Sequence, residues 1–409
     1  MRILNGAAAI IAIALLAACS GAGAPPVTQQ LPGTTQQNQN AFPSMEDAQD
    51  AALQSMANVA RVCPPPRPGE ASCLSLIRTD ISEHALPDVA GYGPGQLQSA
   101  YKLPSTTKGG GQTVAIVDAF NDPNAEKDLG VYRKNFGLTA CTTANGCFRK
   151  VNQTGGTKYP PNDPGWGLEM SLDLDMASAV CPRCHILLVE ATSNSFSNLG
   201  KAVSEAAKLH ANVISNSYGG SEYGASDPNY SHPGTVITAS AGDNGYGPQE
   251  PCTFQTVVCI GGTTLTKSTT VARGWKETVW SGTGSGCSAI VAKPSWQTDT
   301  GCRRRTASDT SADANPNTGV ALYDSYGYGG WNVVGGTSVS SPIIAAVYAL
   351  AGNASTQTAA KGIWNNAGKN LFDVTLGSNG GCTPAYLCHG EKGYDGPTGW
   401  GTPNGVTAY

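Results

Sequence analysis

Ser338 is the residue in this sequence best placed to act as a nucleophile. It follows Gly335-Gly336-Thr337 and precedes a run of small and apolar residues over 343–351, a pattern that predicts the start of a helix. Unpaired backbone N–H groups and the helix dipole favour negative charge at such an end, and would therefore stabilise an attacked carbonyl oxygen. The pattern predicts nucleophilic attack on a carbonyl carbon by this serine.

A serine nucleophile needs a base, and two carboxyl groups are the candidates. The five histidines stand alone in the sequence, whereas Glu169 and Asp173 lie four residues apart within 168–179. Positions i and i+4 share one face of a helix, so both carboxyl groups would point the same way. Asp175, at i+6 from Glu169, would point away. Because the surrounding residues are apolar, we do not interpret this pair as acids on a solvated helix face.

A carboxylate base implies chemistry at acid pH. A glutamate whose pKa is about 4.3 is a poor proton acceptor from serine at neutral pH, but it matches a medium near pH 4. Two adjacent carboxyl groups cannot easily both ionise, so we expect the pair to share one proton and to titrate as a unit.

The elements that must position these residues alternate between strand-like and helical patterns. Strand-like apolar runs occur at 113–118, 186–190, 213–217 and 236–240, and helical patterns at 124–136, 168–179 and 198–209. This alternation predicts an α/β fold with a mostly parallel central sheet and helices on both faces. Asp118, Ser217 and Asp243 lie at the carboxyl ends of these strands, where chemistry gathers in such sheets.

Four motifs, taken together, resemble the sedolisin family of serine-carboxyl peptidases, which has a subtilisin-like fold. In chain order they are the strand 113–118, Glu169-x-x-x-Asp173, Ser240-Ala241-Gly242-Asp243 and Gly335-Gly336-Thr337-Ser338. The matching residues run from about 92 to 405.

The resemblance implies a role for each of these residues. Ser338 would be the nucleophile, Glu169 the general base, and Asp173 the group that orients Glu169. Asp243 would donate a hydrogen bond to the oxyanion, which requires it to be protonated; an ordinary turn is the alternative for this segment. Two further residues fall where some members extend the hydrogen-bond network behind the catalytic pair: Asp118 and Tyr218.

The function that follows is an exported serine-carboxyl endopeptidase that hydrolyses protein or peptide substrates at acidic pH through a Ser338 acyl-enzyme. One alternative is a catalytically silent surface lipoprotein that binds peptides in the same cleft. Another is a thiol oxidoreductase that uses Cys181 and Cys184.

The resemblance also implies one structural calcium ion (Ca2+) near the C-terminus. The carboxylates of Asp373 and Asp395 would bind it together with the carbonyls of Val374, Glu391 and Gly393. The alternative is a glycine-rich terminal loop held by the cysteines at 382 and 388.

The N-terminus predicts export. We expect residues 1–19 to be a signal peptide, and Leu16-Ala17-Ala18-Cys19 resembles a bacterial lipobox in which Cys19 would be lipidated; a plain signal peptide is the alternative. The composition predicts a flexible tether over 20–44. For 45–91 we expect a helix over 45–62 and an irregular proline-rich stretch, a propeptide remnant by this interpretation, before the peptidase domain at 92–409. The predicted location is the bacterial cell envelope or the medium, with membrane contact only through Cys19.

Cysteine count and charge complete the sequence-based expectations. Apart from Cys19, twelve cysteines fall into six neighbouring pairs, which suggests a disulfide framework; Cys181 and Cys184 form one of these pairs. A net charge of −4 argues against a nucleic-acid partner, and we interpret the basic run 303–305 as a solvated loop. The sequence contains no interface signal, so we expect a monomer.

Overall fold

The computed structural model describes residues 58–81 and 89–409, which are built around an eight-stranded sheet. The strands are β4 (Thr113–Ala119), β5 (Phe148–Asn152), β6 (His185–Ala191), β7 (Val213–Asn216), β9 (Val236–Ser240), β10 (Val258–Lys267), β11 (Trp275–Val279) and β14 (Thr310–Asp313). Their order is β11-β10-β9-β7-β4-β6-β5, with β14 beside β10. All pairings are parallel except β10 with β11, so the predicted mostly parallel sheet is confirmed.

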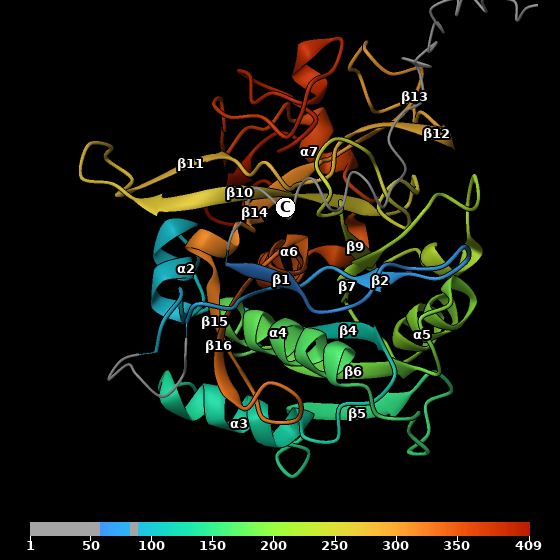
Figure 1. Cartoon of the computed structure of the whole chain (residues 1–409), viewed down its shortest axis with the longest axis vertical. Helices are drawn as coiled ribbons and strands as arrows, with labels where there is room; N and C mark the ends of the chain where they lie inside the picture. The colour runs from blue at the N-terminus through green and yellow to red at the C-terminus, as the bar shows by residue number, and fades with distance from the viewer. Residues whose placement is uncertain (1–57, 82–88) are drawn as a thin grey trace, which may run out of the picture. The chain divides into compact units, whose positions relative to one another are not determined.

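Six helices accompany this sheet in the described part of the chain. They are α2 (Pro94–Ala100), α3 (Ala125–Asn135), α4 (Pro164–Val180), α5 (Phe196–Lys208), α6 (Thr337–Ala351) and α7 (Lys361–Asn365). Helix α4 begins where Asp163 accepts a 2.9 Å hydrogen bond from the Trp166 amide, and Pro164 suits its first position. Because α4 packs against α6, α3 and β4, every residue after Pro164 is buried (Figure 1). Its two acids therefore lie inside the protein.

Residues 59–78 form strands that the sequence did not predict. A four-stranded sheet has the order β1 (Val59–Arg61), β3 (Leu76–Arg78), β16 (Gly330–Gly335) and β15 (Val320–Asp324). Strand β2 (Ser72–Cys73) pairs antiparallel with β8 (Tyr218–Gly219). Figure 1 draws β1 and β2 in blue, and β2 contacts α4.

Two expectations for the N-terminal part are therefore wrong. Residues 59–61, which were predicted to be the end of a helix over 45–62, form strand β1 instead. The stretch that was expected to be irregular contains β2 and β3. Pairing with strands far away in the sequence overrides the local pattern here. Residues 45–57 lie outside the described residues, as do the predicted signal peptide, Cys19 and the tether. No helix within 58–81 or 89–409 has both the length and the apolar character needed to cross a membrane.

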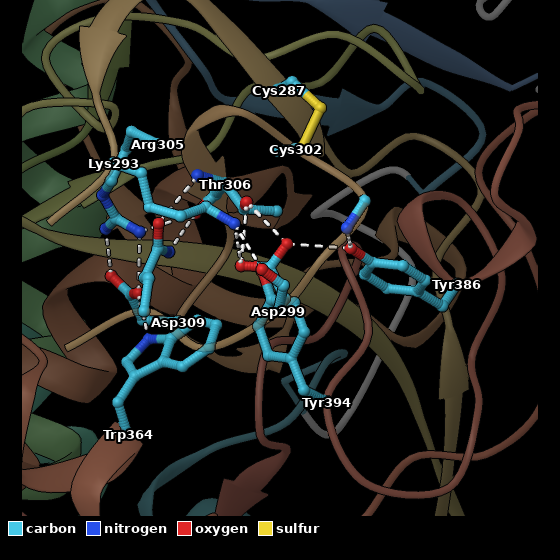
Figure 2. A network of polar contacts seen from close by, with 12 residues as sticks. Cys287, Lys293, Asp299, Cys302, Arg305, Thr306, Asp309, Trp364, Tyr386 and Tyr394 are labelled. Atoms are coloured by element: carbon cyan, nitrogen blue, oxygen red, sulfur yellow. Dashed lines mark hydrogen bonds and ion pairs between the residues drawn. A yellow bond between two sulfur atoms is a disulfide. The ribbon is translucent and has the colours of Figure 1, made fainter. Parts of the chain in front are cut away.

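The basic run 303–305 is not a solvated loop throughout. Arg305 is fully buried, and an ion pair with Asp309, at 2.5 Å, compensates its buried charge (Figure 2). Asp309 also accepts a 2.7 Å hydrogen bond from Trp364 Nε1 of α7. Arg303 and Arg304 are exposed as expected.

A second polar network in Figure 2 connects this region to the C-terminal segment. Asp299 accepts hydrogen bonds of 2.8 Å from Lys293 and from the hydroxyl of Tyr386. Nearby short elements are β12 (Gly286–Ala292), β13 (Arg304–Ala307), β17 (Leu371–Phe372) and β18 (Thr402–Pro403). The 3-10 helices are Pro228–Tyr230, Pro316–Thr318, Ala354–Thr356 and Ala385–Leu387.

The six predicted neighbour disulfides are confirmed. They are Cys63–Cys73, Cys141–Cys147, Cys181–Cys184, Cys252–Cys259, Cys287–Cys302 and Cys382–Cys388. The Cys181–Cys184 pair joins the end of α4 to the start of β6, as a structural cross-link would.

Candidate active site

Three buried carboxyl groups lie close enough together for each to affect the ionisation of another. Glu169 and Asp173 come from α4, and Asp118 comes from β4; all three side chains are fully buried. Burial raises the pKa of Glu169 and of Asp173 well above the usual range, and the charge of Asp118 raises both further. Glu169 Oε1 and Asp173 Oδ2 accept no hydrogen bond from the described residues. The group can therefore hold protons that isolated carboxyls would release near pH 4.

Ser338 lies at the start of α6, close to this group. Its hydroxyl donates a 3.1 Å hydrogen bond to the Ser217 carbonyl, and its proximity to Glu169 lowers the pKa of that carboxyl group. The hydroxyl of Ser217 in turn donates to Asp173 Oδ1 at 2.7 Å. The structure thus brings together the predicted nucleophile, the predicted base and the acid behind it.

Asp243 contacts Thr337, the residue before Ser338. Its Oδ1 accepts hydrogen bonds from the backbone and the hydroxyl of Thr337, at 2.8 and 2.7 Å. Oδ2 is buried and accepts none from the described residues. Burial raises the pKa of Asp243 to about 6, although Thr337 and the charge of Arg61 oppose the shift. Below about pH 6 the group is protonated, so it can donate from Oδ2.

The segment 71–78, which contains the short strands β2 and β3 and which we name the N-terminal strand, runs past these groups. The Leu74 amide donates to the Ser217 carbonyl at 3.3 Å, the same oxygen that accepts from Ser338. The Leu74 carbonyl oxygen lies against Gly336: a Cβ at Gly336 would be 1.9 Å from that oxygen and 2.6 Å from Asp243 Oδ2. Only glycine fits here, both for this reason and because its φ is 100°.

Ser75, the next residue of the strand, contacts the base. Its hydroxyl donates to Glu169 Oε2 at 2.7 Å. The Leu74–Ser75 peptide bond is therefore flanked by the predicted nucleophile, the predicted base and the predicted oxyanion donor. Sequence reasoning missed both residues; their only signal was the neighbouring Cys63 and Cys73, whose disulfide holds the strand.

Neither Tyr218 nor Asp175 forms a hydrogen bond with Glu169, Asp173 or Asp118 in the described residues. The hydroxyl of Tyr218 donates to Asn216 at 2.7 Å and lies 3.0 Å from the hydroxyl of Tyr230. Asp175 accepts a 3.0 Å hydrogen bond from the amide of Tyr323 in β15, as its i+6 position predicts.

The predicted calcium ligands lie together near the C-terminus. The Gly393 amide donates to Asp373 at 3.0 Å, and the Glu391 amide donates to Asp395 at 3.1 Å. Burial first, and then the nearby charge of Asp373 among other causes, raise the pKa of Asp395 well above the usual range. Val374, the remaining predicted ligand, is buried.

The carboxylates of Asp373 and Asp395 are available to bind a cation. Neither carboxylate forms an ion pair within the described residues. No cluster of three or more His, Cys, Asp or Glu side chains able to hold a metal occurs there either, so a site would depend on two carboxylates and backbone carbonyls.

Comparison with known proteins agrees with this geometry. The subtilase family model matches residues 155–401, more than half of the chain. The chain belongs to the subtilase family. Kumamolisin of Bacillus sp. (strain MN-32) is 27% identical over 355 residues, which are 77% of this chain and 62% of kumamolisin. Sedolisin of Pseudomonas sp. (strain 101) is 25% identical over 396 residues, which are 85% and 64%.

This subtilase is similar in structure to a solved sedolisin. The Pseudomonas sedolisin, a serine-carboxyl proteinase complexed with two molecules of pseudo-iodotyrostatin, matches with a TM-score of 0.66 and 25% identity over 78% of this chain and 96% of that chain. The predicted subtilisin-like fold and the resemblance to sedolisins are confirmed. The chain spans less than two thirds of the length of the curated relatives.

Proposed function

We propose that this subtilase is a serine-carboxyl peptidase that hydrolyses protein or peptide substrates at acidic pH. The observation that carries the proposal is the position of the Leu74–Ser75 peptide bond. It has Ser338 on one side, Glu169 beside Ser75, and Asp243 beside the Leu74 carbonyl oxygen. A peptide bond in this position meets every group that acyl transfer to serine needs.

In the first half of the proposed reaction, Ser338 Oγ attacks the carbonyl carbon of the bound peptide. Glu169 takes the hydroxyl proton, and Asp173 supports the shared charge of the carboxyl pair. Protonated Asp243 donates a hydrogen bond to the developing oxyanion. The C–N bond then breaks, and Glu169 returns the proton to the leaving amine. In the second half, water hydrolyses the acyl-enzyme with Glu169 again as base.

The acidic range follows from opposite demands on these carboxyl groups. The three carboxyls Glu169, Asp173 and Asp118 must carry at least one negative charge among them, whereas Asp243 must keep its proton. Since the pKa of Asp243 is about 6, activity should fall above that pH. Loss of one oxyanion donor typically reduces the rate by ~10² to 10³, so the enzyme would be nearly silent at neutrality.

Three further features belong to the proposal. The peptidase is exported and held at the bacterial cell envelope by a lipid on Cys19, or is secreted. It acts as a monomer. Calcium stabilises the C-terminal loop through Asp373, Asp395 and the carbonyls of Val374, Glu391 and Gly393; the two adjacent carboxylates without ion pairs in the described residues support this.

The test is peptide hydrolysis by the full chain from about pH 2.5 to about pH 8, spanning the carboxyl pKa range. An unfolded protein serves as substrate and products are identified by mass spectrometry. We expect activity below about pH 6, inhibition by pseudo-iodotyrostatin and no activity in Ser338→Ala. Ser340→Ala is the control, because this buried serine of α6 bonds only the Thr337 carbonyl. Peptide binding without hydrolysis at any pH would instead indicate the silent binding protein.

A further inference from the structure

We infer that the N-terminal strand is this enzyme's own substrate, and that it reveals the preferred substrate class: Ser338 cleaves the Leu74–Ser75 bond, and the pocket around Leu74 selects a leucine-sized aliphatic side chain. The inference rests on the proposed function. To that function it adds the bond that is cleaved, Leu74–Ser75, the side chain that is recognised, Leu74, and a residue that determines specificity, Gln249.

Residues before the bond lie on the body as an added β-strand. The Ala71 amide donates to the Asn194 carbonyl at 2.8 Å, and the Asn194 side chain donates to the Ala71 carbonyl at 2.8 Å. Ser72 then pairs with Gly219, and Cys73 with Tyr218, in antiparallel register. Main-chain bonds of this kind hold any extended peptide, whereas side-chain pockets select its sequence.

Leu74 fills a pocket that is separate from the hydrophobic core. Its side chain is 3% exposed, yet it joins neither core cluster of the described residues. It borders a space that Gly219, Asn244 and Gln249 line on the body side, and that Arg61, Pro65, Pro66 and Ser72 line on the side of the N-terminal segment. This space measures about 10 Å³, which is at most enough for one water molecule. Leu74 therefore leaves almost no empty volume on this side.

Gln249 lines the space beside Leu74 on the body side. It is 5% exposed, and its Oε1 accepts no hydrogen bond from the described residues. A Cβ at Gly219 would lie 2.3 Å from that oxygen, and a Cβ at Gly242 would lie 2.9 Å from Gln249 Cδ. Gln249 thus packs against the two glycines beside the pocket. A shorter side chain at 249 would enlarge the pocket and admit larger residues.

The cleavage balances as an ordinary hydrolysis. Ser338 Oγ bonds to the Leu74 carbonyl carbon and its proton passes to Glu169. The C–N bond breaks, with the proton going to the Ser75 nitrogen. One water then cleaves the ester, which restores Ser338 and leaves a Leu74 carboxylate and a Ser75 amine. The products are residues up to 74 and the body 75–409.

The first experiment follows the purified full chain at several pH values below about 6, where Asp243 keeps its proton, by intact mass and N-terminal sequencing. We expect the wild type to yield a body that begins at Ser75, at a rate independent of protein concentration because the strand lies in its own active site. Ser338→Ala should stay intact. Leu74→Asp should slow the cut at least ~100-fold, because it buries a charge in the pocket, whereas Leu74→Met should still be cut.

The second experiment uses an added peptide that copies residues 70–79, with serine replacing Cys73 to prevent cross-linking. Versions with leucine, phenylalanine or aspartate at position 74 are compared by kcat/KM. We expect the wild type to prefer leucine. Gln249→Ala should raise the phenylalanine-to-leucine ratio on the order of 10-fold, the lower range for a change of one or two methylenes. Because this peptide is separate from the chain, a folding defect in a Leu74 variant cannot affect the result.

The outcomes separate this inference from the proposed function. If the wild type hydrolyses added peptides but leaves Leu74–Ser75 intact, the strand is not a substrate and the inference fails while the peptidase stands. If Ser338→Ala is cut at the same bond, another agent makes the cut and the inference also fails. An unchanged phenylalanine-to-leucine ratio in Gln249→Ala would overturn the role of Gln249. If the wild type cleaves neither itself nor any peptide, the proposed function itself fails.

Discussion

The hydroxyl of Ser75 donates a 2.7 Å hydrogen bond to Oε2 of Glu169. A residue of the N-terminal strand thereby engages the carboxylate proposed as the base. At the same time the Ser338 hydroxyl donates to the Ser217 carbonyl, which also accepts from the Leu74 amide. The strand therefore lies where a substrate would lie, and it keeps other peptides out while it remains.

Ser75→Ala should shift the pH dependence of self-cleavage upward. The Ser75 hydrogen bond lowers the pKa of Glu169, so its removal raises that pKa and a higher pH is needed to ionise the base. A hydrogen bond to a charged group is worth ~1.5 to 3 kcal/mol, which corresponds to a shift on the order of one pH unit. Ser72→Ala is the control, since its hydroxyl bonds the Pro64 carbonyl. An unchanged profile in Ser75→Ala would contradict the contact.

Neutralising Glu169 or Asp173 of α4 should lower kcat, whereas neutralising Asp175 of the same helix should not. Glu169→Gln should lower kcat by ~10² to 10⁴, the usual contribution of a general base, and Asp173→Asn should also lower it. Asp175→Asn is the matched control, because Asp175 is equally buried on the same helix but accepts from Tyr323. We expect it to leave kcat near the wild-type value. Equal losses in Asp173→Asn and Asp175→Asn, with circular dichroism unchanged, would argue against a special role for Asp173.

Asp243→Asn should extend activity to higher pH. The pKa of Asp243 is about 6, so the wild-type residue loses its proton, and its ability to donate, above that value. The amide of asparagine can accept from Thr337 through its oxygen and donate through its nitrogen at any pH. The alkaline limb of the kcat profile should move upward in the variant. If both profiles fall together near pH 6, another group controls that limb.

The folded protein should lose stability as pH rises from about 4 to about 7. Burial raises the pKa of Asp122, Glu190 and Glu250 to about 7, and that of Asp243 to about 6. In this window the native state keeps protons that the unfolded state releases, so stability falls with increasing pH. Thermal unfolding should show Tm decreasing by several degrees.

Glu250→Gln tests this explanation. The amide oxygen of glutamine can still accept the hydrogen bonds from the amides of Tyr223 and Gly224, at 2.6 and 3.2 Å, but glutamine does not ionise. The decrease in Tm between pH 4 and 7 should be smaller than in the wild type. A Tm that rises with pH in both proteins would contradict the prediction.

Calcium should raise Tm in the wild type but not in Asp395→Asn. A ligand that binds only the native state stabilises it by ~2.7 kcal/mol at one hundred times its dissociation constant, which is worth several degrees. Glu391→Gln is the control, because the proposed contribution of residue 391 is its backbone carbonyl. Chelation should reverse the effect. Equal calcium binding to the wild type and to Asp395→Asn, measured by calorimetry, would remove the proposed site.

Local patterns predicted the strands β4, β6, β7 and β9, the helices α3, α4 and α5, and the carboxyl pair. The strand predicted at 113–118 is β4, and the i, i+4 spacing of Glu169 and Asp173 does place both carboxyls in one buried group. Neighbour pairing of cysteines succeeded because each disulfide closes a short loop, of at most 15 residues in separation. These features depend on contacts close in the sequence.

The features that the sequence did not predict depend on distant partners. Ser75 meets Glu169 across 94 residues, and β2 pairs with Gly219 and Tyr218 of β8, so nothing local marks the N-terminal strand. The ordinary pKa expected for Glu169 is wrong for a related reason: the residue is fully buried, and Asp118 lies nearby.

The Cys63–Cys73 disulfide lies entirely on the N-terminal side of Leu74, and the other five lie entirely on the C-terminal side of Ser75. None of them spans the Leu74–Ser75 bond. Hydrolysis at this bond would therefore leave two pieces with no covalent link among these six. If Cys19 carries a lipid, the lipid stays with the smaller piece. Once β1 and β2 then separate from β3 and β8, a surface-bound precursor would become a freely diffusing enzyme, without a reductant and without a second protease.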